Sequence, residues 1–138
     1  MYQKIMVPVD LAHLDALGKA LATATDLARH YQAGICYVGV TATTPGRIAR
    51  TPEEYQSKLE AFAKEQGEKH GLVAQARVYT AADPLPMLDD LILKAIDESS
   101  ADLLVMATHL PKRLDAVMPS NGNKVASHTD ISVFLVRA

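Results

Sequence analysis

The chain has few of the residues that build covalent or stacked frameworks. It has one cysteine and no tryptophan, and its aromatic residues are five tyrosines and two phenylalanines among 138 residues. One thiol excludes an intramolecular disulfide, and we expect Cys36, which lies in an apolar run, to pack as a small hydrophobic side chain. Such cysteine usage is typical of a reducing compartment. The scattered aromatic residues offer no platform on which nucleic-acid bases could stack.

Long hydrophobic runs and a strong net charge are also lacking. No apolar run approaches the roughly 20 residues that span a bilayer. The first apolar stretch, Ile5–Val9, ends at Asp10 and does not resemble a signal peptide. A net charge of −2 and a pI near 6.2 are unlike a nucleic-acid-binding domain, which carries a basic face. We therefore expect a cytoplasmic protein whose partners are neither membranes nor nucleic acids.

The familiar catalytic and cofactor motifs are missing as well. There is no G-x-G-x-x-G after the first apolar segment and no G-x-x-x-x-G-K-[ST] anywhere. No C-x-x-C, H-E-x-x-H or G-x-S-x-G occurs, and the five histidines are too scattered to indicate a metal site. The sequence therefore predicts no catalytic residues and no metal site, and it favours a binding protein over an enzyme.

What is present is an alternation of apolar segments and amphipathic helices. Five apolar segments read as strands: 4–10, 35–40, 73–79, 103–107 and 131–136. Three of them carry no charge, and the first carries charge only at its two ends, Lys4 and Asp10; this is typical of a parallel sheet covered by helices on both sides. The third alternates with Gln75 and Arg77, so we expect it at an edge. Pro8 lacks an N–H and should end regular pairing near the close of the first strand.

Helices are predicted between these strands from periodicity and capping signals. One runs from His13 to Tyr31, with Gly34 as a stop signal. Another begins at Thr51-Pro-Glu-Glu54, a capping box, and ends at Gly71. A third begins at Asp83-Pro84 by the same logic. Residues 1–138 are therefore predicted to form one α/β domain with an open parallel five-stranded sheet and helices on both faces.

Residues 101–137 hold the most informative polar loop. Thr108 and His109 follow the fourth strand, and Ser120-Asn121-Gly122 opens the last helix, where amides and a hydroxyl could hold an anion. In open parallel sheets ligands bind beyond the carboxyl ends of the strands. Two readings stay open at each position. Ser120 could simply cap its helix, the Thr108–His109 pair could be an exposed loop, and Asp10 could cap a turn or contact a base or sugar.

Four motifs resemble those of the universal stress protein family along the whole chain. The opening K-I-M-V-P-V-D is similar to the family's apolar strand ending in P-x-D, and A-D-L-L-V-M-A-T-H is similar to its A-D-L-I-V-M-G-S-H. The ending V-A-S-H-T-D-I-S-V-F-L-V-R is similar to V-L-R-H-A-x-C-P-V-L-V-V-R, and A-A-D-P resembles its G-D-P. The resemblance implies a Rossmann-like, adenine nucleotide alpha hydrolase-like sheet of order 3-2-1-4-5.

The resemblance also implies an adenine-nucleotide site. Many family members bind ATP through G-x-x-G-x9-G-[ST] after the fourth strand. By resemblance, the residues at the site would be Pro8, Val9, Asp10, Val40, Met106, Ala107, Thr108, His109, Ser120, Asn121 and Gly122. The first three and Val40 would line the adenine and ribose, and the loop residues would surround the ribose and phosphates.

The chain departs from this motif at all three glycines. Ala107, Leu110 and Pro119 stand in their places, although Thr108-His109-Leu110-Pro111 and Ser120-Asn121 resemble a nucleotide-binding branch with S-H-R-P and then G-S-N. Pro119 offers no N–H, and glycine is what lets backbone amides approach a phosphate. We therefore expect weak binding of ATP or AMP, with magnesium only as the companion of ATP. Activity would be at most that of a weak ATPase. The alternative is a family member that has lost nucleotide binding and acts through protein–protein interaction.

The last strand predicts the partner. It is apolar up to Arg137, so its outer edge would expose a pairing template that folded proteins cover or pair. Members of the family commonly dimerise by pairing this strand across a two-fold axis. The resemblance therefore predicts a homodimer with Val133 and Leu135 at the seam, and a role in stress response.

Overall fold

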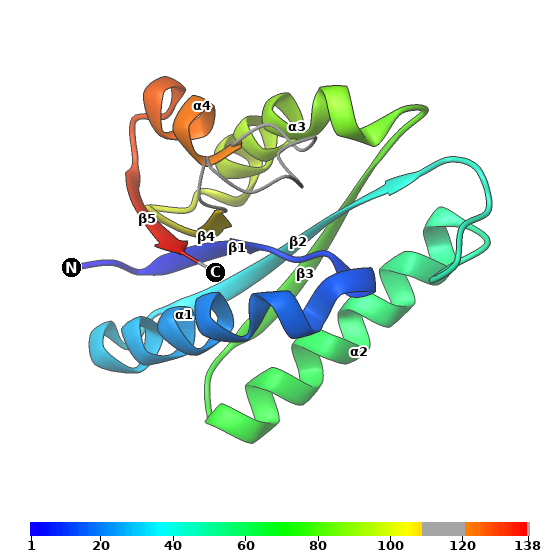
Figure 1. Ribbon diagram of the computed structural model, residues 1–138. Coiled ribbons are helices and arrows are strands. Elements are labelled where there is room, and N and C mark those ends of the chain that lie inside the picture. The colour runs from blue at the N-terminus through cyan, green and yellow to red at the C-terminus, as the bar shows by residue number, and fades with distance from the viewer. Residues whose placement is uncertain (109–120, 138) are drawn as a thin grey trace.

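The computed structural model describes residues 1–108 and 121–137, which form a parallel five-stranded sheet between two layers of helices (Figure 1). The strands are β1 (Lys4–Pro8), β2 (Gly34–Ala42), β3 (Ala74–Ala81), β4 (Leu103–Thr108) and β5 (Ser132–Arg137). The helices are the 3-10 helix η1 (Leu11–Leu17) and the α-helices α1 (Gly18–Tyr31), α2 (Pro52–His70), α3 (Pro84–Ser99) and α4 (Asn121–His128). The strand order β3-β2-β1-β4-β5 confirms the predicted α/β fold.

Two apolar cores lie on opposite faces of the sheet because the strand side chains alternate between them. In β1, Ile5 and Val7 pack on the face covered by α1 and α2, whereas Met6 packs on the face covered by α3 and α4 (Figure 1). All three are at most 1% exposed. A strand buried on both faces must be apolar throughout, which is the pattern that identified the sheet in the sequence.

The capping signals around α2 have the expected geometry, with one shift. Thr51 Oγ1 accepts a hydrogen bond from Glu54 N at 3.1 Å, and Pro52 occupies the first turn. The Glu54 carboxylate accepts from Arg50 N at 3.2 Å, one residue before the Thr51 amide that a capping box would use. Gly71 ends the helix at φ 66°, in the left-handed conformation that glycine adopts without steric cost.

One predicted helix end and two predicted terminal signals differ from the structure. The helix predicted from His13 is a 3-10 segment up to Leu17, and α1 begins only at Gly18. The helix α1 ends at Tyr31 as predicted, but its C-cap is Gln32 with φ 56°, and Gly34 already belongs to β2. The helix α3 begins at Pro84 after Asp83 as predicted, but the Asp83 side chain makes no capping bond. The first difference arises because the amides after β1 bond to Asp10 and to a tyrosine hydroxyl.

Asp102 joins β1 to β4 at the amino end of the sheet. Its two carboxylate oxygens accept hydrogen bonds from Gln3 N at 2.9 Å and Lys4 N at 3.0 Å. Its own amide donates to Lys4 O at 3.0 Å. One side chain therefore sets the register of the central strand pair. The opposite, carboxyl end of the same pair is where a ligand site is expected.

Candidate functional site

The pairing between β1 and β4 stops before β1 ends. β1 pairs with β2 as far as Pro8, opposite Val38, but with β4 only as far as Met6, opposite Leu104. The chain order reverses between β1 and β4, because β2 and β3 lie on one side and β5 on the other. The end of pairing therefore coincides with the topological switch point, where open α/β sheets bind ligands.

Pro8 explains why the pairing stops there. Successive amides along a strand point to opposite neighbours, and Val9 N donates to Val38 O of β2 at 2.8 Å. The nitrogen of Pro8 therefore faces β4, and it carries no hydrogen to donate. In agreement, Lys4 O, an even number of residues before Pro8, faces the β4 side and accepts from Asp102 N. The predicted loss of pairing at Pro8 is confirmed on the β4 side.

Asp10 stands directly beyond this strand end. Its Oδ1 accepts a hydrogen bond from Ala12 N at 2.9 Å, and its Oδ2 lies 2.8 Å from His13 Nδ1. Both side chains are exposed. The prediction that Asp10 caps the following turn is thus confirmed. This cap leaves the carboxylate open to solvent, where a ligand could still reach it.

A buried tyrosine supports the backbone next to Asp10. The Tyr55 hydroxyl of α2 accepts a hydrogen bond from Leu11 N at 3.3 Å, and burial raises the pKa of Tyr55. Its ring lies against Gly39 of β2, where an added Cβ would sit 2.7 Å from Tyr55 Cε1. This role of Tyr55 was not predicted from the sequence. The one available signal was Gly39 inside a strand, which often marks a close approach.

Most of the predicted site residues that the structure describes lie at the carboxyl ends of neighbouring strands. Val9 is buried just after β1, and Val40 is half-buried near the end of β2, paired with Tyr79. In β4, Met106 and Thr108 are buried, and Ala107 between them is half-buried. With Pro8 and Asp10 these residues mark one edge of the sheet.

The phosphate side of the predicted site falls largely outside this description. His109 and Ser120, together with Leu110 and Pro119 at two of the glycine positions, lie outside the described residues. Asn121 and Gly122 lie in the first turn of α4. The anion-binding prediction for this loop therefore stays a prediction.

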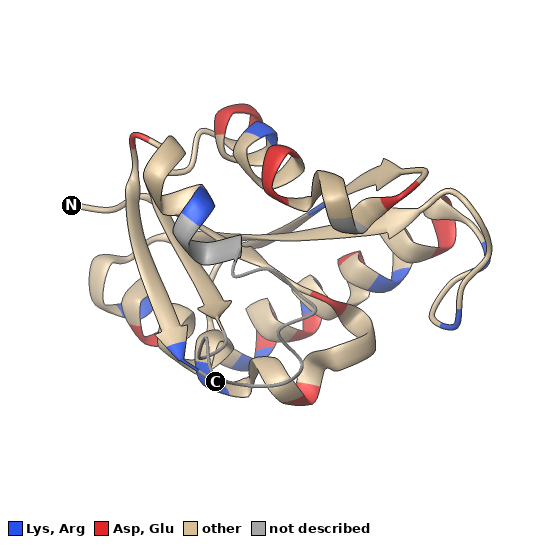
Figure 2. Ribbon diagram, turned by 45° about the horizontal axis from the view of Figure 1, so that its top comes forward, with Lys and Arg blue, Asp and Glu red and all other residues tan. Residues whose placement is uncertain are grey.

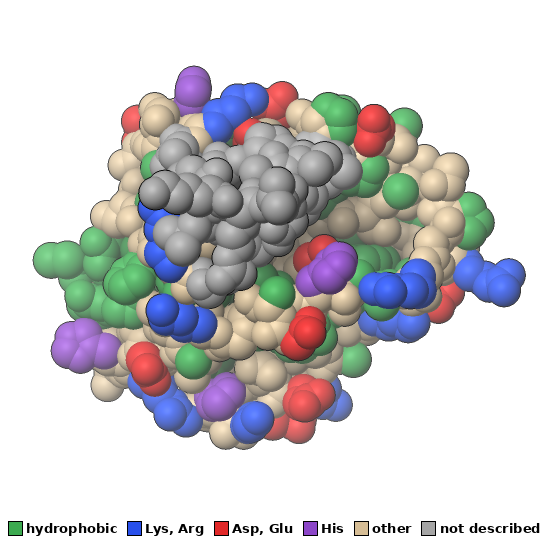
Figure 3. All heavy atoms as spheres, in the orientation of Figure 1, with side chains coloured by type: hydrophobic (Ala, Val, Ile, Leu, Met, Phe, Trp, Pro, Cys, Tyr) green, Lys and Arg blue, Asp and Glu red, His purple; other side chains and the backbone are tan. Residues whose placement is uncertain are grey.

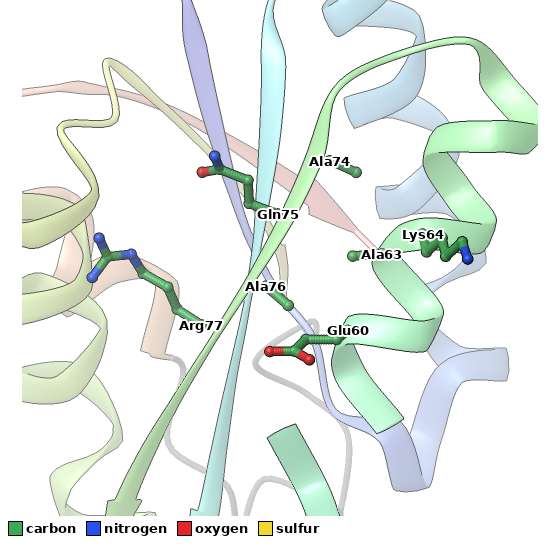
Figure 4. Close-up of a pocket in the computed structure, with 7 residues that line it drawn as sticks. All are labelled: Glu60, Ala63, Lys64, Ala74, Gln75, Ala76 and Arg77. Atoms are coloured by element: carbon green, nitrogen blue, oxygen red, sulfur yellow. The ribbon is translucent and has the colours of Figure 1, made fainter. Parts of the chain in front are cut away.

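A separate groove lies at the far edge of the sheet. It has a volume of ≈ 610 Å³ and runs between β3 and α2, lined by Glu60, Ala63, Lys64, Ala74, Gln75, Ala76 and Arg77 (Figure 4). Figure 4 shows Gln75 and Arg77 on the side of β3 away from α2, and Lys64 directed away from the strand. None of the predicted site residues lines this groove. Its width comes from the alanines on both sides, and we assign no ligand to it.

Charges of both signs are mixed over the described surface. Lysine, arginine and acidic residues are interspersed along the helices (Figure 2), and the face in Figure 3 shows basic and acidic side chains as near neighbours. Among the described residues, no group of three or more histidine, cysteine or acidic side chains could hold a metal ion. Within the same residues, no helix is long and apolar enough to cross a membrane.

Comparisons with known proteins point to one family. A model described as the universal stress protein family matches residues 1–137. A crystal structure of a universal stress protein in complex with cAMP superposes with a TM-score of 0.71 at 20% identity, covering 98% of this chain and 97% of that one. The structure of the universal stress protein from Archaeoglobus fulgidus in complex with dAMP superposes with a TM-score of 0.64 at 19% identity, covering 97% of each chain.

A third structure extends the same fold to plants. A universal stress protein family protein from Arabidopsis thaliana with AMP bound gives a TM-score of 0.63 at 16% identity, covering 98% of this chain and 90% of that one. No curated protein matches the sequence at a significant level. At these identities the structural likeness shows a shared fold.

Proposed function

This chain belongs to the universal stress protein family, and from that premise we propose that it binds an adenine nucleotide, ATP or AMP, as part of a stress response. The nucleotide would lie across the carboxyl ends of β1, β2 and β4. Pro8, Val9 and Val40 would line the adenine, with Asp10 at the ribose. The loop that follows Thr108, with the start of α4, would face the phosphates.

The observation that carries this proposal is the early end of the β1–β4 pairing, at Met6 and Leu104. Solved relatives with cAMP, dAMP and AMP support an adenine nucleotide as the ligand. The partly buried Ala107 argues for weak affinity, because its methyl group stands where the family motif has the first glycine. A methyl group there would hold backbone and ligand apart.

We propose a binding role without a dedicated catalytic set, with at most a weak ATPase activity and with magnesium entering only together with ATP. We also propose a cytoplasmic homodimer that pairs through β5. Val133 and Leu135 are half-buried in this edge strand, and its neighbouring Phe134 is 45% exposed, so pairing would cover apolar surface.

A second candidate function is a family member that has lost its ligand and acts only through protein contacts. Ala107 favours it, as do Leu110 and Pro119 in the sequence. The two candidates differ in one measurable property, which is the affinity for free nucleotide.

Isothermal titration calorimetry with AMP, and with ATP plus magnesium, tests the proposal. We expect a dissociation constant between about 10 μM and 1 mM, equivalent to about 4–7 kcal/mol. Ala107→Gly should bind more tightly, because it restores the motif glycine. Gln75→Ala, in the remote groove, serves as the matched control and should bind like the unsubstituted chain. Absence of binding at millimolar nucleotide by both the chain and Ala107→Gly would favour the second candidate.

A further inference from the structure

His13 is held against Asp10 by a local break in the 3-10 helix. Its backbone, at φ −134° and ψ 41°, leaves the helical conformation inside η1. The imidazole therefore points toward Asp10, and its Nδ1 lies 2.8 Å from Asp10 Oδ2. Because a carboxylate can only accept, Nδ1 carries the hydrogen of this bond and Nε2 faces away from it.

The turn that carries the pair is anchored from two other elements. Leu11 N donates to the hydroxyl of Tyr55 in α2, and Arg47 Nη2, from the loop after β2, donates to Ala12 O at 3.4 Å. These bonds fix the backbone directly after Asp10, between it and His13. The position of His13 therefore follows from the fold, and not from the exposed pair alone.

Capping needs only one of the two carboxylate oxygens. Oδ1 of Asp10 accepts from Ala12 N, which satisfies the turn. The bond from His13 to Oδ2 adds nothing to that cap, but it restrains rotation of the carboxylate about its last bond. With one acceptor site used on each oxygen, about two lone-pair sites of the carboxylate remain for a ligand.

We propose that His13 is a positioning residue, which orients the Asp10 carboxylate to accept hydrogen bonds from the two ribose hydroxyls of a bound nucleotide. This inference rests on the proposed nucleotide site and adds to it the group that sets recognition of the sugar. A cis-diol presents two donors side by side, which match the two acceptor sites left on a fixed carboxylate. A freely rotating carboxylate would lose orientational freedom on binding and would discriminate less.

The ratio of two affinities isolates this effect. AMP and 2′,3′-dideoxy-AMP share base and phosphate and differ only in the hydroxyls that Asp10 would hold. Hydrogen bonds to a charged group change an equilibrium by about tenfold or more, so we expect the chain to prefer AMP by about that factor. In His13→Ala the preference should fall to about threefold or less, with the dideoxy-AMP affinity unchanged. The amide nitrogen of His13→Asn can take the place of Nδ1, so this variant should keep the preference.

Two further variants serve as controls. Asp10→Asn keeps a capping oxygen but offers the diol a mixed amide, so it should lose the preference while η1 stays folded. Asp15→Asn, in the same segment, makes the same charge change on an exposed side chain and should behave like the unsubstituted chain.

Each result decides the matter. If neither nucleotide binds to the unsubstituted chain, the proposed function and this inference both fail. If the chain binds AMP but His13→Ala weakens AMP and dideoxy-AMP equally, or binds AMP more tightly, the function stands and His13 has no positioning role. Failure of His13→Asn to retain a preference that His13→Ala loses would also overturn the inference.

Discussion

The contact between Gly39 and Tyr55 is the sharpest steric constraint near the candidate site. A Cβ added at Gly39 would lie 2.7 Å from Tyr55 Cε1 and 3.1 Å from Leu59 Cδ2. Both neighbours are buried, at 5% and 0% exposure, so neither side chain can move aside into solvent. Overpacking of this kind costs about 1–3 kcal/mol, and the lower chain entropy of alanine when unfolded returns about 0.4–1 kcal/mol. The difference spans about 0 to 2.6 kcal/mol. Because the 2.7 Å contact is with a buried ring, we expect Gly39→Ala to lower the free energy of unfolding by about 1–2 kcal/mol.

Urea denaturation followed by circular dichroism measures this change as a lower midpoint at constant m-value. Gly18→Ala is the matched control, since nothing lies within 4 Å of its added Cβ and its φ of −53° suits alanine. It should be more stable than the unsubstituted chain by about 0.4–1 kcal/mol. In Tyr55→Ala the ring is absent, so adding Gly39→Ala should lower the free energy of unfolding only a little further. The double variant should therefore deviate from additivity by about 1 kcal/mol or more.

An unchanged or raised midpoint for Gly39→Ala would refute the steric argument. Additive effects in the double variant would show that the cost arises elsewhere in β2. Because Tyr55 also receives the hydrogen bond from Leu11, a displaced ring should weaken AMP binding as well. Normal binding in a destabilised Gly39→Ala would show that Tyr55 supports the fold and not the site.

Four further outcomes follow from the structure. Asp102→Ala should lower the free energy of unfolding by about 2–4 kcal/mol, because it removes both acceptors of the Gln3 and Lys4 amides; Asp97→Ala, exposed on α3, should change it by less than about 0.5 kcal/mol in the same urea assay. Cys36 is fully buried and burial raises its pKa, so a thiol reagent should label it only after unfolding, and rapid labelling of the native chain would contradict the packing. Burial raises the pKa of Tyr37 to about 12 from 10, so its contribution to stability is present below pH 10 and is lost as pH rises from 10 to 12; Tyr37→Phe should lose less stability over that range, as measured by urea midpoints at each pH. Leu135→Asp should shift the β5-paired dimer to monomer in light scattering, and an unsubstituted chain that is monomeric at micromolar concentration would exclude the dimer.

The fold was predictable because its main determinant is local in the sequence. Strands free of charge alternate with amphipathic helices, and this alone implies a parallel sheet with helices on both faces. The strand order came from the family resemblance. Helix ends were less predictable, since the start of α1 depends on where the amides after β1 find acceptors. One of those acceptors is Tyr55, in a helix far along the chain.

The candidate site was predictable where it follows from strand ends and hidden where it depends on contacts between elements. Asp10 and Thr108 could be placed because each directly follows or closes an apolar run. In the sequence, Asp102 looks like an ordinary residue before a strand. Its role as acceptor for the Gln3 and Lys4 amides exists only when β1 lies beside β4. His13 read as the start of a helix, because its contact with Asp10 needs a backbone break that no propensity predicts.

Proline inside the central strand of a sheet normally argues against that strand, since it removes a ladder hydrogen bond. Here β1 is central and Pro8 closes it, and the hydrogen bond that proline removes lies on the β4 side, where the pairing ends at Met6 and Leu104. The P-V-D sequence after Val7 thus has a physical meaning beyond family membership. Proline ends the pairing of β1 with β4, and Val9 continues the hydrogen bonding to β2 through its bond to Val38. Asp10 then follows at the strand end that β4 leaves unpaired. A residue with an N–H at position 8 could extend the β1–β4 ladder into that edge, so the same covalent feature that ends the strand keeps room for a ligand.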